Sequence, residues 1–379
     1  MKKISILSLH LGYGGVEKSI VTLANLLSND YQVEIVSIYN LYGTSVFPIN
    51  KNVKVTYLLP KDLVPNGKEW KESLRNIRLL RFIKESYHAC KVLYNRKKMM
   101  KKYLKITDSD VIISSRFLFN NWLDQYGPKS ALKIGWEHNH HHNDMKYSAK
   151  VIHSAYNLDY FVLVSKDLER FYHHKMLNYH VKTVYIPNTL EHIPRSKSSL
   201  IEKRLVSVGR LSKEKGYLDL LKIYSVIVKK YPDWVLDIVG DGNEKEELEK
   251  FIQEHQLQDK VTLHGFQNSD YIDKLLDHSS IYIMTSFTES FGIVLLEAMS
   301  HGLPCVAFDS AEGAREVITS GRDGYLIKNR NQEMMIKKIT DLIKDREKRQ
   351  ALGKEGRKKV KLFSKESVRE KWIELIEKK

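Results

Sequence analysis

The residues most suited to chemistry are two glutamates on either side of a glycine, directly after an apolar segment. The run Glu289-Ser-Phe-Gly-Ile-Val-Leu-Leu-Glu297 follows the strand-like Ile281–Met284. A helix that begins near Gly292 leaves backbone N–H groups unpaired in its first turn, and such an N-terminus favours a phosphate. A carboxylate accepts hydrogen bonds from paired hydroxyls, as a sugar or a ribose presents them. The alternative is an ordinary buried helix with two surface glutamates.

A second block places basic residues after another apolar strand. The segment Arg204–Val208 ends at Gly209, and Arg210 and Lys215 follow. Arginine grips a diphosphate through two N–H groups, and lysine adds a compact charge. A third block, Asp237-Ile-Val-Gly-Asp-Gly242, is a further strand that ends in a glycine turn. It either approaches a nucleotide base or is only a turn.

The elements that position these blocks alternate between short β-rich runs and helical periodicities, which predicts parallel sheets with crossover helices. The expected strands are Lys3–Leu9, Gln32–Ile38, Val53–Tyr57, Val111–Ser114, Leu132–Trp136, Tyr160–Val164, Arg204–Val208, Val235–Val239, Val261–Leu263, Ile281–Met284 and Pro304–Ala307. The pattern pauses at Tyr185–Asn188. A chain of 379 residues suits two α/β domains. We therefore expect Rossmann-like domains at 1–187 and 188–363, and an amphipathic helix at 364–379 that packs back on the first domain.

Composition limits the class of protein. The two cysteines lie far apart, so no disulfide framework is implied, and this agrees with a reducing compartment. No stretch approaches the roughly 18 apolar residues of a membrane span. The apolar run after Met1 ends quickly at His10, which favours a buried first strand over a signal peptide. The sequence thus predicts a cytoplasmic protein.

The net charge of +16 is concentrated in residues 68–105, which hold thirteen basic residues against three glutamates. Apolar side chains recur there at helical spacing, namely at Ile77, Leu80, Ile83, Tyr87, Cys90 and Tyr94. A basic amphipathic helix is typical of an element at a membrane surface. The alternative is that the apolar stripe packs on the first domain while the charge faces water.

Taken together, the blocks at Gly209–Gly216, Gly240–Gly242 and Glu289–Glu297 resemble the retaining, two-Rossmann (GT-B) glycosyltransferases of family 4. The run Gly12-Tyr-Gly-Gly-Val-Glu17 is similar to the glycine loop near the N-terminus of that family. The resemblance covers the whole chain. It departs at Asn188-Thr189, where many members have Asn-Gly, and the hinge geometry is left open there.

The resemblance implies an α/β fold of two Rossmann-like domains that face each other across a cleft, and it implies roles for individual residues. Glu289 and His138 are the implied catalytic pair, with Glu289 on the donor sugar and His138 at a strand end of the first domain. The implied substrate-binding residues are Gly14, Gly15, Arg210, Lys215, Phe266, Phe291, Gly292, Ile293 and Glu297. Arg210 and Lys215 would hold the diphosphate, Phe266 would lie near the base, and Glu297 would bind the ribose.

The same resemblance implies transfer of a hexose or N-acetylhexosamine, with UDP as the expected carrier, to a lipid-linked or surface-polysaccharide acceptor. No cofactor and no metal are expected, because adjacent histidines in the run His138–His142 do not converge on one ion. An anionic membrane surface is the expected partner, at the inner face of the cell membrane. The alternatives are a nucleotide-sugar epimerase of similar fold and a basic nucleic-acid-binding protein. No recognition motif for nucleic acid is present.

Overall fold

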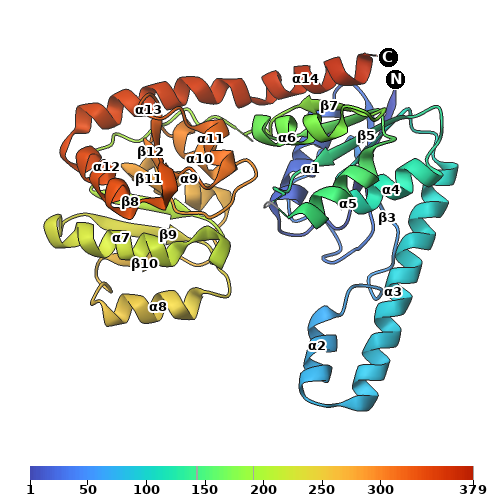
Figure 1. The fold of residues 1–379 in the computed structure, drawn as a ribbon, viewed down its shortest axis with the longest axis horizontal. Helices are drawn as coiled ribbons and strands as arrows, with labels where there is room; N and C mark the ends of the chain where they lie inside the picture. Colours follow the sequence, from blue (N-terminus) through green and yellow to red (C-terminus); the bar gives the residue numbers. More distant parts are fainter. Residues whose placement is uncertain (142–143, 191, 379) are drawn as a thin grey trace. The chain divides into compact units, whose positions relative to one another are not determined.

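The computed structural model describes residues 1–141, 144–190 and 192–378, which fall into two units. The first unit comprises residues 1–164, 168–186 and 369–379, and the second comprises 165–167 and 187–368. Each unit is built on one sheet with helical connections (Figure 1). All strand pairs within both sheets are parallel, so the fold is the expected pair of Rossmann-like sheets.

The sheet of the first unit has seven strands in the order β3-β2-β1-β4-β5-β6-β7. Its strands are β1 (Lys3–Ser8), β2 (Gln32–Ser37), β3 (Val53–Tyr57), β4 (Val111–Ser114), β5 (Leu132–Glu137), β6 (Tyr160–Leu163) and β7 (Lys182–Tyr185). The helices are α1 (Gly15–Leu27), α2 (Gly67–Arg75), α3 (Leu79–Ile106), α4 (Phe117–Tyr126), α5 (Met145–Ala155) and α6 (Lys166–Met176). The strand order reverses between β1 and β4, and ligands of such sheets bind where this reversal occurs.

The sheet of the second unit has six strands in the order β10-β9-β8-β11-β12-β13. Its strands are β8 (Arg204–Val208), β9 (Val235–Val239), β10 (Val261–Leu263), β11 (Ile281–Met284), β12 (Cys305–Phe308) and β13 (Gly324–Ile327). The helices are α7 (Tyr217–Lys230), α8 (Lys245–Glu254), α9 (Ser269–Asp277), α10 (Ile293–Ser300), α11 (Glu312–Val317), α12 (Gln332–Lys344) and α13 (Arg346–Val360), with the short 3-10 turns η1 (Lys213–Lys215), η2 (Lys328–Arg330) and η3 (Lys361–Phe363). The last helix, α14 (Lys365–Glu377), begins in this unit and belongs to the first unit from Arg369 onward. Here the order reverses between β8 and β11.

The end of the chain is anchored by large apolar side chains. Trp372 of α14 is fully buried, and its ring lies 5.2 Å from that of Trp136 at the end of β5. Arg369 forms a forked ion pair with Asp30, which follows α1, at 2.5 Å. Bidentate arginine–carboxylate pairs fix orientation as well as charge. From Arg369 onward, the chain is therefore part of the first unit.

The helical hairpin of α2 and α3 extends away from the sheet of the first unit (Figure 1). The two helices hold each other through Trp70, whose indole N–H donates to Ser86 at 2.9 Å and whose ring lies 5.4 Å from Phe82. Along the 28 residues of α3, the buried side chains are Val92, Met100 and Leu104. The C-terminal half of α3 is thus packed on the unit, whereas its N-terminal half is largely exposed. No helix in the described ranges has the length and apolarity needed to cross a bilayer.

Candidate active site

Two loops meet at the point where the strand order of the second unit reverses. β8 and β11 are adjacent parallel strands, so their carboxyl ends lie at the same edge of the sheet. The loop after β8 runs through Gly209 and Arg210 to Lys215, and the loop after β11 runs through Glu289 to Gly292. The two densest sequence motifs are therefore brought together at the position where open α/β sheets bind ligands.

The closest contact between these loops joins Lys215 and Glu289. The Lys215 Nζ donates to Glu289 Oε2, and the two side chains are 23% and 19% exposed. They lie 74 residues apart in the sequence. A partly buried ammonium–carboxylate pair offers both a cation for a phosphate and an acceptor for hydroxyl groups within one contact.

The Gly-Asp-Gly turn after β9 serves as a brace for the loop that carries Arg210. A Cβ at Gly240 would lie 1.9 Å from the carbonyl oxygen of Gly209, and one at Gly242 would lie 2.2 Å from that of Leu211. The Leu211 N–H donates to the Asp241 carbonyl at 3.0 Å. Only glycine permits this approach of backbone to backbone. The motif therefore forms a tight turn that supports the neighbouring loop.

The second loop ends in a helix start that only a glycine adopts easily. Gly292 has φ 84° and ψ 50°, in the left-handed region, and it immediately precedes α10. The Gly313 N–H donates to the Glu289 carbonyl at 2.6 Å. A Cβ at Gly313 would lie 2.4 to 2.6 Å from backbone atoms of Phe291. The loop from Glu289 to Gly292 is therefore held against α11 without any side chain between them.

An arginine that the motifs did not single out holds the beginning of this loop. Arg330 donates to the carbonyls of Thr285 and Ser286, at 3.0 Å each, and forms an ion pair with Asp219 at 2.6 Å. Its guanidinium also lies 3.6 Å from the ring centroid of Phe287. A planar guanidinium satisfies several acceptors at fixed angles, which lysine does not. No local signal marks this residue in the sequence, since its partners are 20 to 111 residues away.

The remaining residues that sequence analysis placed in this unit occupy different surroundings. The Arg210 side chain is 71% exposed, with its guanidinium 3.9 Å from Glu214. Phe266, after β10, is 63% exposed. Ile293 and Glu297 are half-buried on α10, and Phe291 is buried, with its ring 5.7 Å from that of Phe363. Thus Lys215, at the end of η1, and Glu289, in the loop that leads to α10, form a partly buried pair. Arg210 and Phe266 lie exposed on loops at the same edge of the sheet.

In the first unit, the glycine loop leads into α1. A Cβ at Gly14 would lie 2.0 Å from Glu17 Oε2, whereas one at Gly15 would meet nothing within 4 Å. Glu17 is buried and accepts a hydrogen bond from Arg116 at 2.8 Å. A side chain at Gly14 would thus displace the end of the buried Glu17 side chain, whereas one at Gly15 would meet no neighbour in the described part of the chain.

Two adjacent titratable residues at the end of β5 are buried and shifted in opposite directions. Burial raises the pKa of Glu137 to about 7, although Glu137 accepts a hydrogen bond from the Asn139 N–H at 2.8 Å. Burial lowers the pKa of His138 to about 3, with a further contribution from the positive charge of Arg116. The His138 Nε2 has no hydrogen-bond partner among the described residues. The Glu137 carboxyl is therefore mostly protonated between pH 4.5 and about 7, where a glutamate in water carries a negative charge. The His138 imidazole is mostly neutral between about pH 3 and 6.5, where a histidine in water carries a positive charge.

The histidine run beside this strand does not form a metal site in the part that the structure describes. His141 stacks on Phe171 at 3.7 Å between ring centroids, and His140 lies 4.1 Å from His141. Within residues 1–141, 144–190 and 192–378, no group of three ligating side chains is placed to hold an ion. His142 lies outside the described residues.

This geometry, two parallel Rossmann-like sheets with a glycine-capped helix and a Lys–Glu pair at the switch point of the second, defines the class of GT-B glycosyltransferases. Solved structures of that fold superimpose over the chain. TarM matches with a TM-score of 0.79 at 19% identity, covering 100% of this chain and 99% of that one. Sucrose-phosphate synthase from Thermosynechococcus elongatus matches with a TM-score of 0.80 at 18% identity and the same coverage.

Sequence comparison narrows the class. Residues 190–359 match the family described as Glycosyl transferases group 1. An uncharacterized glycosyltransferase of Haemophilus influenzae is 27% identical over 98% of this chain and 99% of its own length. The poly(glycerol-phosphate) alpha-glucosyltransferase of Bacillus subtilis is 31% identical over 62% of this chain, but this region spans only 36% of that protein. The chain is a glycosyltransferase whose residues 190–359 match group 1, which replaces the epimerase and nucleic-acid-binding alternatives.

Proposed function

We propose that this enzyme transfers a hexose or N-acetylhexosamine, with retention of configuration, from a UDP-sugar to a lipid-linked or surface-polysaccharide acceptor. The observation that carries the proposal is the Lys215–Glu289 pair beside the glycine-capped start of α10. HepE of Anabaena, which shares the fold, has been crystallised with UDP. A relative in Campylobacter jejuni, 26% identical over 99% of this chain, is named as an N-acetylgalactosaminyltransferase acting on an undecaprenol-linked saccharide.

In the proposed complex, cations and backbone dipoles bind the donor diphosphate. Lys215 and Arg210 hold its oxygens, and the N–H groups of Phe291, Gly292 and Ile293 donate to it from the start of α10. Glu297, farther along α10, binds the ribose hydroxyls, and Phe266 lies near the base. Because these charges and dipoles are fixed before the donor arrives, they stabilise the leaving diphosphate without reorganisation during the reaction.

The proposed chemical step breaks the bond between the sugar's anomeric carbon and the diphosphate oxygen. The acceptor hydroxyl forms the new bond on the same face of the sugar and gives its proton to the departing phosphate. No side-chain nucleophile takes part. Glu289 orients the sugar hydroxyls and stabilises positive charge at the anomeric carbon. We propose Gly14, Gly15 and His138 as donor contacts from the first unit, with His138 as the second catalytic residue; its neutral imidazole suits a hydrogen bond to a sugar hydroxyl. We expect no metal requirement.

A thermal-shift titration with UDP, GDP and ADP tests the donor site. We expect UDP alone to stabilise the wild type, and we expect Arg210→Ala to weaken UDP binding about tenfold or more, because it removes charge-assisted hydrogen bonds. Arg322→Ala is the matched control, since Arg322 is similarly exposed but lies on the turn before β13. Glu289→Ala should bind UDP yet lose sugar transfer. If no nucleotide stabilises the wild type at millimolar concentration, the proposal is wrong.

We further propose that residues 68–105 hold the enzyme on an anionic membrane surface. The structure bears on the choice between the two interpretations of this segment, because its apolar stripe is exposed rather than packed on the first unit. Ile77, Leu80, Ile83, Tyr87 and Tyr94 are 89%, 86%, 55%, 72% and 66% exposed. Basic residues beside such a stripe contribute roughly 1 kcal/mol each near an anionic bilayer.

Sedimentation with vesicles that contain anionic lipid tests this second proposal. We expect the wild type to bind at low salt, and Leu80→Ser/Ile83→Ser to lose most of the bound fraction, because apolar insertion is removed while every charge is kept. Ile201→Ser is the matched control, since Ile201 is 61% exposed in the second unit. Equal binding of wild type and double variant would contradict insertion of the stripe.

A further inference from the structure

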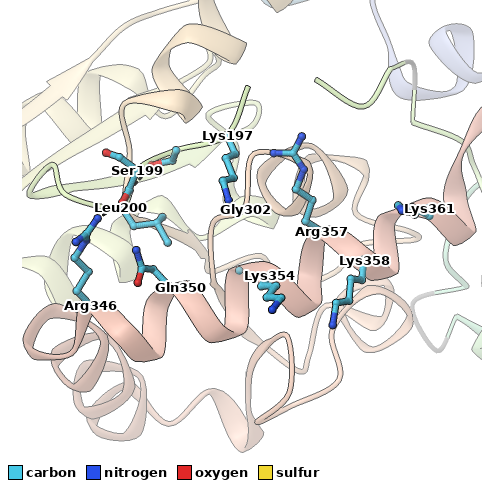
Figure 2. A pocket seen from close by; sticks show the side chains of 12 residues that line it. Lys197, Ser199, Leu200, Gly302, Arg346, Gln350, Lys354, Arg357, Lys358 and Lys361 are labelled. Carbon is cyan, nitrogen blue, oxygen red and sulfur yellow. Dashed lines mark hydrogen bonds between the residues drawn. The ribbon is translucent and has the colours of Figure 1, made fainter. Parts of the chain in front are cut away.

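A basic pocket in the second unit is not explained by donor binding. Its volume is about 580 Å³, and it lies between α13, the loop at Gly302 and residues 197–200. Figure 2 shows that most of its basic side chains come from a single helix and the turn that follows. The six cations that line it are Lys197, Arg346, Lys354, Arg357, Lys358 and Lys361.

No negative charge balances these cations inside the pocket. None of its lining residues, all of which the structure describes, carries a carboxylate. The two arginines are held by neutral partners, since Arg346 donates to the Ser199 carbonyl and Arg357 to the Ser196 carbonyl, at 3.0 Å each. Lys358 has one acidic neighbour, Glu355, at 2.5 Å on the adjacent part of α13. The pocket therefore concentrates positive potential, and low-dielectric walls strengthen such a field.

The cations are arranged as a row rather than a cluster. Residues 346, 350, 354, 357 and 361 are spaced three to four apart, so four cations and Gln350 share one face of α13 and its extension. The fifteen residues of α13 span about 22 Å at 1.5 Å per residue. Two of the lining residues meet backbone to backbone, because a Cβ at Gly353 would lie 1.9 Å from the Gly302 carbonyl oxygen. A narrow row of this length fits successive anionic groups along a chain better than a single small anion.

The row leads toward the proposed donor site. α13 packs directly on α10, where a Cβ at Gly356 would lie 3.1 Å from the Met299 side chain. Lys361, at the end of the row, begins the short turn that ends at Phe363, and the Phe363 ring contacts Phe291 in the loop before α10. A chain that lies along α13 is thus directed to the loop that we propose to bind the donor.

We propose that this pocket binds an extended polyanionic chain, carrying phosphate or sulfate groups at regular intervals, as the acceptor of the transfer reaction. The assignment as acceptor rests on the proposed function, whereas the binding of a polyanion does not. The lining of the pocket favours a polyanionic chain over a bilayer as the ligand. Insertion into a bilayer requires exposed apolar side chains, and the single apolar residue in the lining, Leu200, is buried.

Lysine acetylation mapped by mass spectrometry locates the ligand on the full chain, with short linear polyphosphate as the probe. We expect polyphosphate to protect Lys354, Lys358 and Lys361, and to leave Lys229 and Lys230 at the end of α7 unprotected. These two are also exposed lysines of the second unit. Because residues 68–105 are basic as well, protection there is expected and does not count for the proposal. Equal labelling of the pocket lysines with and without probe would overturn it.

Fluorescence anisotropy with labelled polyphosphate then measures the contribution of the pocket. Lys354→Gln/Lys361→Gln should weaken binding about tenfold and lower the slope of log Kd against log salt by about two, one for each lost contact. The matched variant Lys229→Gln/Lys230→Gln should bind as the wild type does. Equal losses in both variants would show only a diffuse charge effect and would refute the pocket.

Two further measurements distinguish a polyanion site from a membrane contact, and a failure of this proposal from a failure of the proposed function. Binding of anionic vesicles that depends on the same two lysines, without binding of polyphosphate, would replace the proposal with a membrane contact. UDP stabilisation is measured in the pocket variant and should equal that of the wild type. If polyphosphate binds in the pocket but UDP never stabilises the protein, the proposed function fails and the polyanion site stands.

Discussion

Replacing Gly313 with alanine should disable the proposed donor site through backbone displacement alone. The added Cβ would lie 2.4, 2.5 and 2.6 Å from the C, N and Cα atoms of Phe291. Moving from 2.4 Å to the roughly 3.4 Å of ordinary contact requires a shift of about 1 Å. All three atoms belong to the backbone, so no side chain can rotate away. The shift must also stretch the 2.6 Å hydrogen bond from Gly313 to the Glu289 carbonyl.

Helix propensity alone predicts that Gly313→Ala stabilises the protein, so the sign of the change in stability distinguishes the two effects. Gly313 lies within α11, where alanine is favoured over glycine by about 1 kcal/mol. Overpacking against fixed backbone costs about 1 to 3 kcal/mol, so we expect net destabilisation. We expect a larger effect on function, because a misplacement of about 1 Å costs about 100-fold in turnover.

The assays are UDP thermal shift and sugar transfer, with Gly67→Ala as control. Gly67 begins α2, where a Cβ meets nothing within 4 Å. We expect Gly67→Ala to behave as the wild type in both assays, and Gly313→Ala to bind UDP at least about tenfold more weakly. If Gly313→Ala is more stable than the wild type and transfers sugar normally, then the contact with Phe291 relaxes without cost and the reasoning is refuted.

Two more predictions follow from charged groups that are partly or fully buried. Arg330→Lys should lower the free energy of unfolding by about 2 kcal/mol, because lysine does not reproduce the fork that joins Asp219 to two carbonyls; urea titration measures it, and an unchanged midpoint would contradict it. The second concerns pH. With its folded pKa raised from 4.5 to about 7, Glu137 makes stability fall as pH rises through that range, whereas His138, lowered from 6.5 to about 3, makes stability rise from pH 3 to 6.5. The two slopes oppose each other between pH 4.5 and 6.5, so the free energy of unfolding of the wild type changes little there. Glu137→Gln removes the contribution of the glutamate, so the free energy of unfolding of this variant should fall by about 3 kcal/mol between pH 6.5 and pH 4.5 as a result of His138 alone. Parallel pH profiles of the two proteins in urea unfolding would refute this prediction.

The architecture could be predicted because buried parallel strands are recognisable as short apolar β-rich runs. Each of the eleven predicted strands is present to within a residue or two. The two that were missed are β7 and β13, at the edges of the two sheets. β7 is only half-buried, so its pattern is weak. β13 begins at Gly324, where a Cβ would lie 2.5 Å from the Cys305 carbonyl, and a glycine at that point is typical of a turn.

The hairpin at 68–105 shows what periodicity does and does not determine. The sequence placed an apolar stripe on a helix, and α3 carries that stripe from Leu80 onward, whereas Ile77 lies in the turn between α2 and α3 with φ 52°. Periodicity gives the face on which side chains lie but not what covers it, so packing and exposure were equally compatible with the pattern. Exposure follows from the tertiary structure, because α3 contacts the unit only near its C-terminal half, through residues such as Met100 and Leu104.

The donor motifs were predicted from strand ends and glycines, but their coupling was not. Lys215 and Glu289 were assigned separately, one to the diphosphate and the other to the sugar, whereas the structure joins them in a single contact. Sequence does not report contacts between loops 74 residues apart. In the function that we propose, a donor enters beside this pair or separates it, with its phosphate oxygens facing Lys215 and its sugar hydroxyls facing Glu289. The bond that breaks joins the sugar's anomeric carbon to the diphosphate oxygen, so in the proposed complex the pair places one charge of each sign at the two sides of that bond.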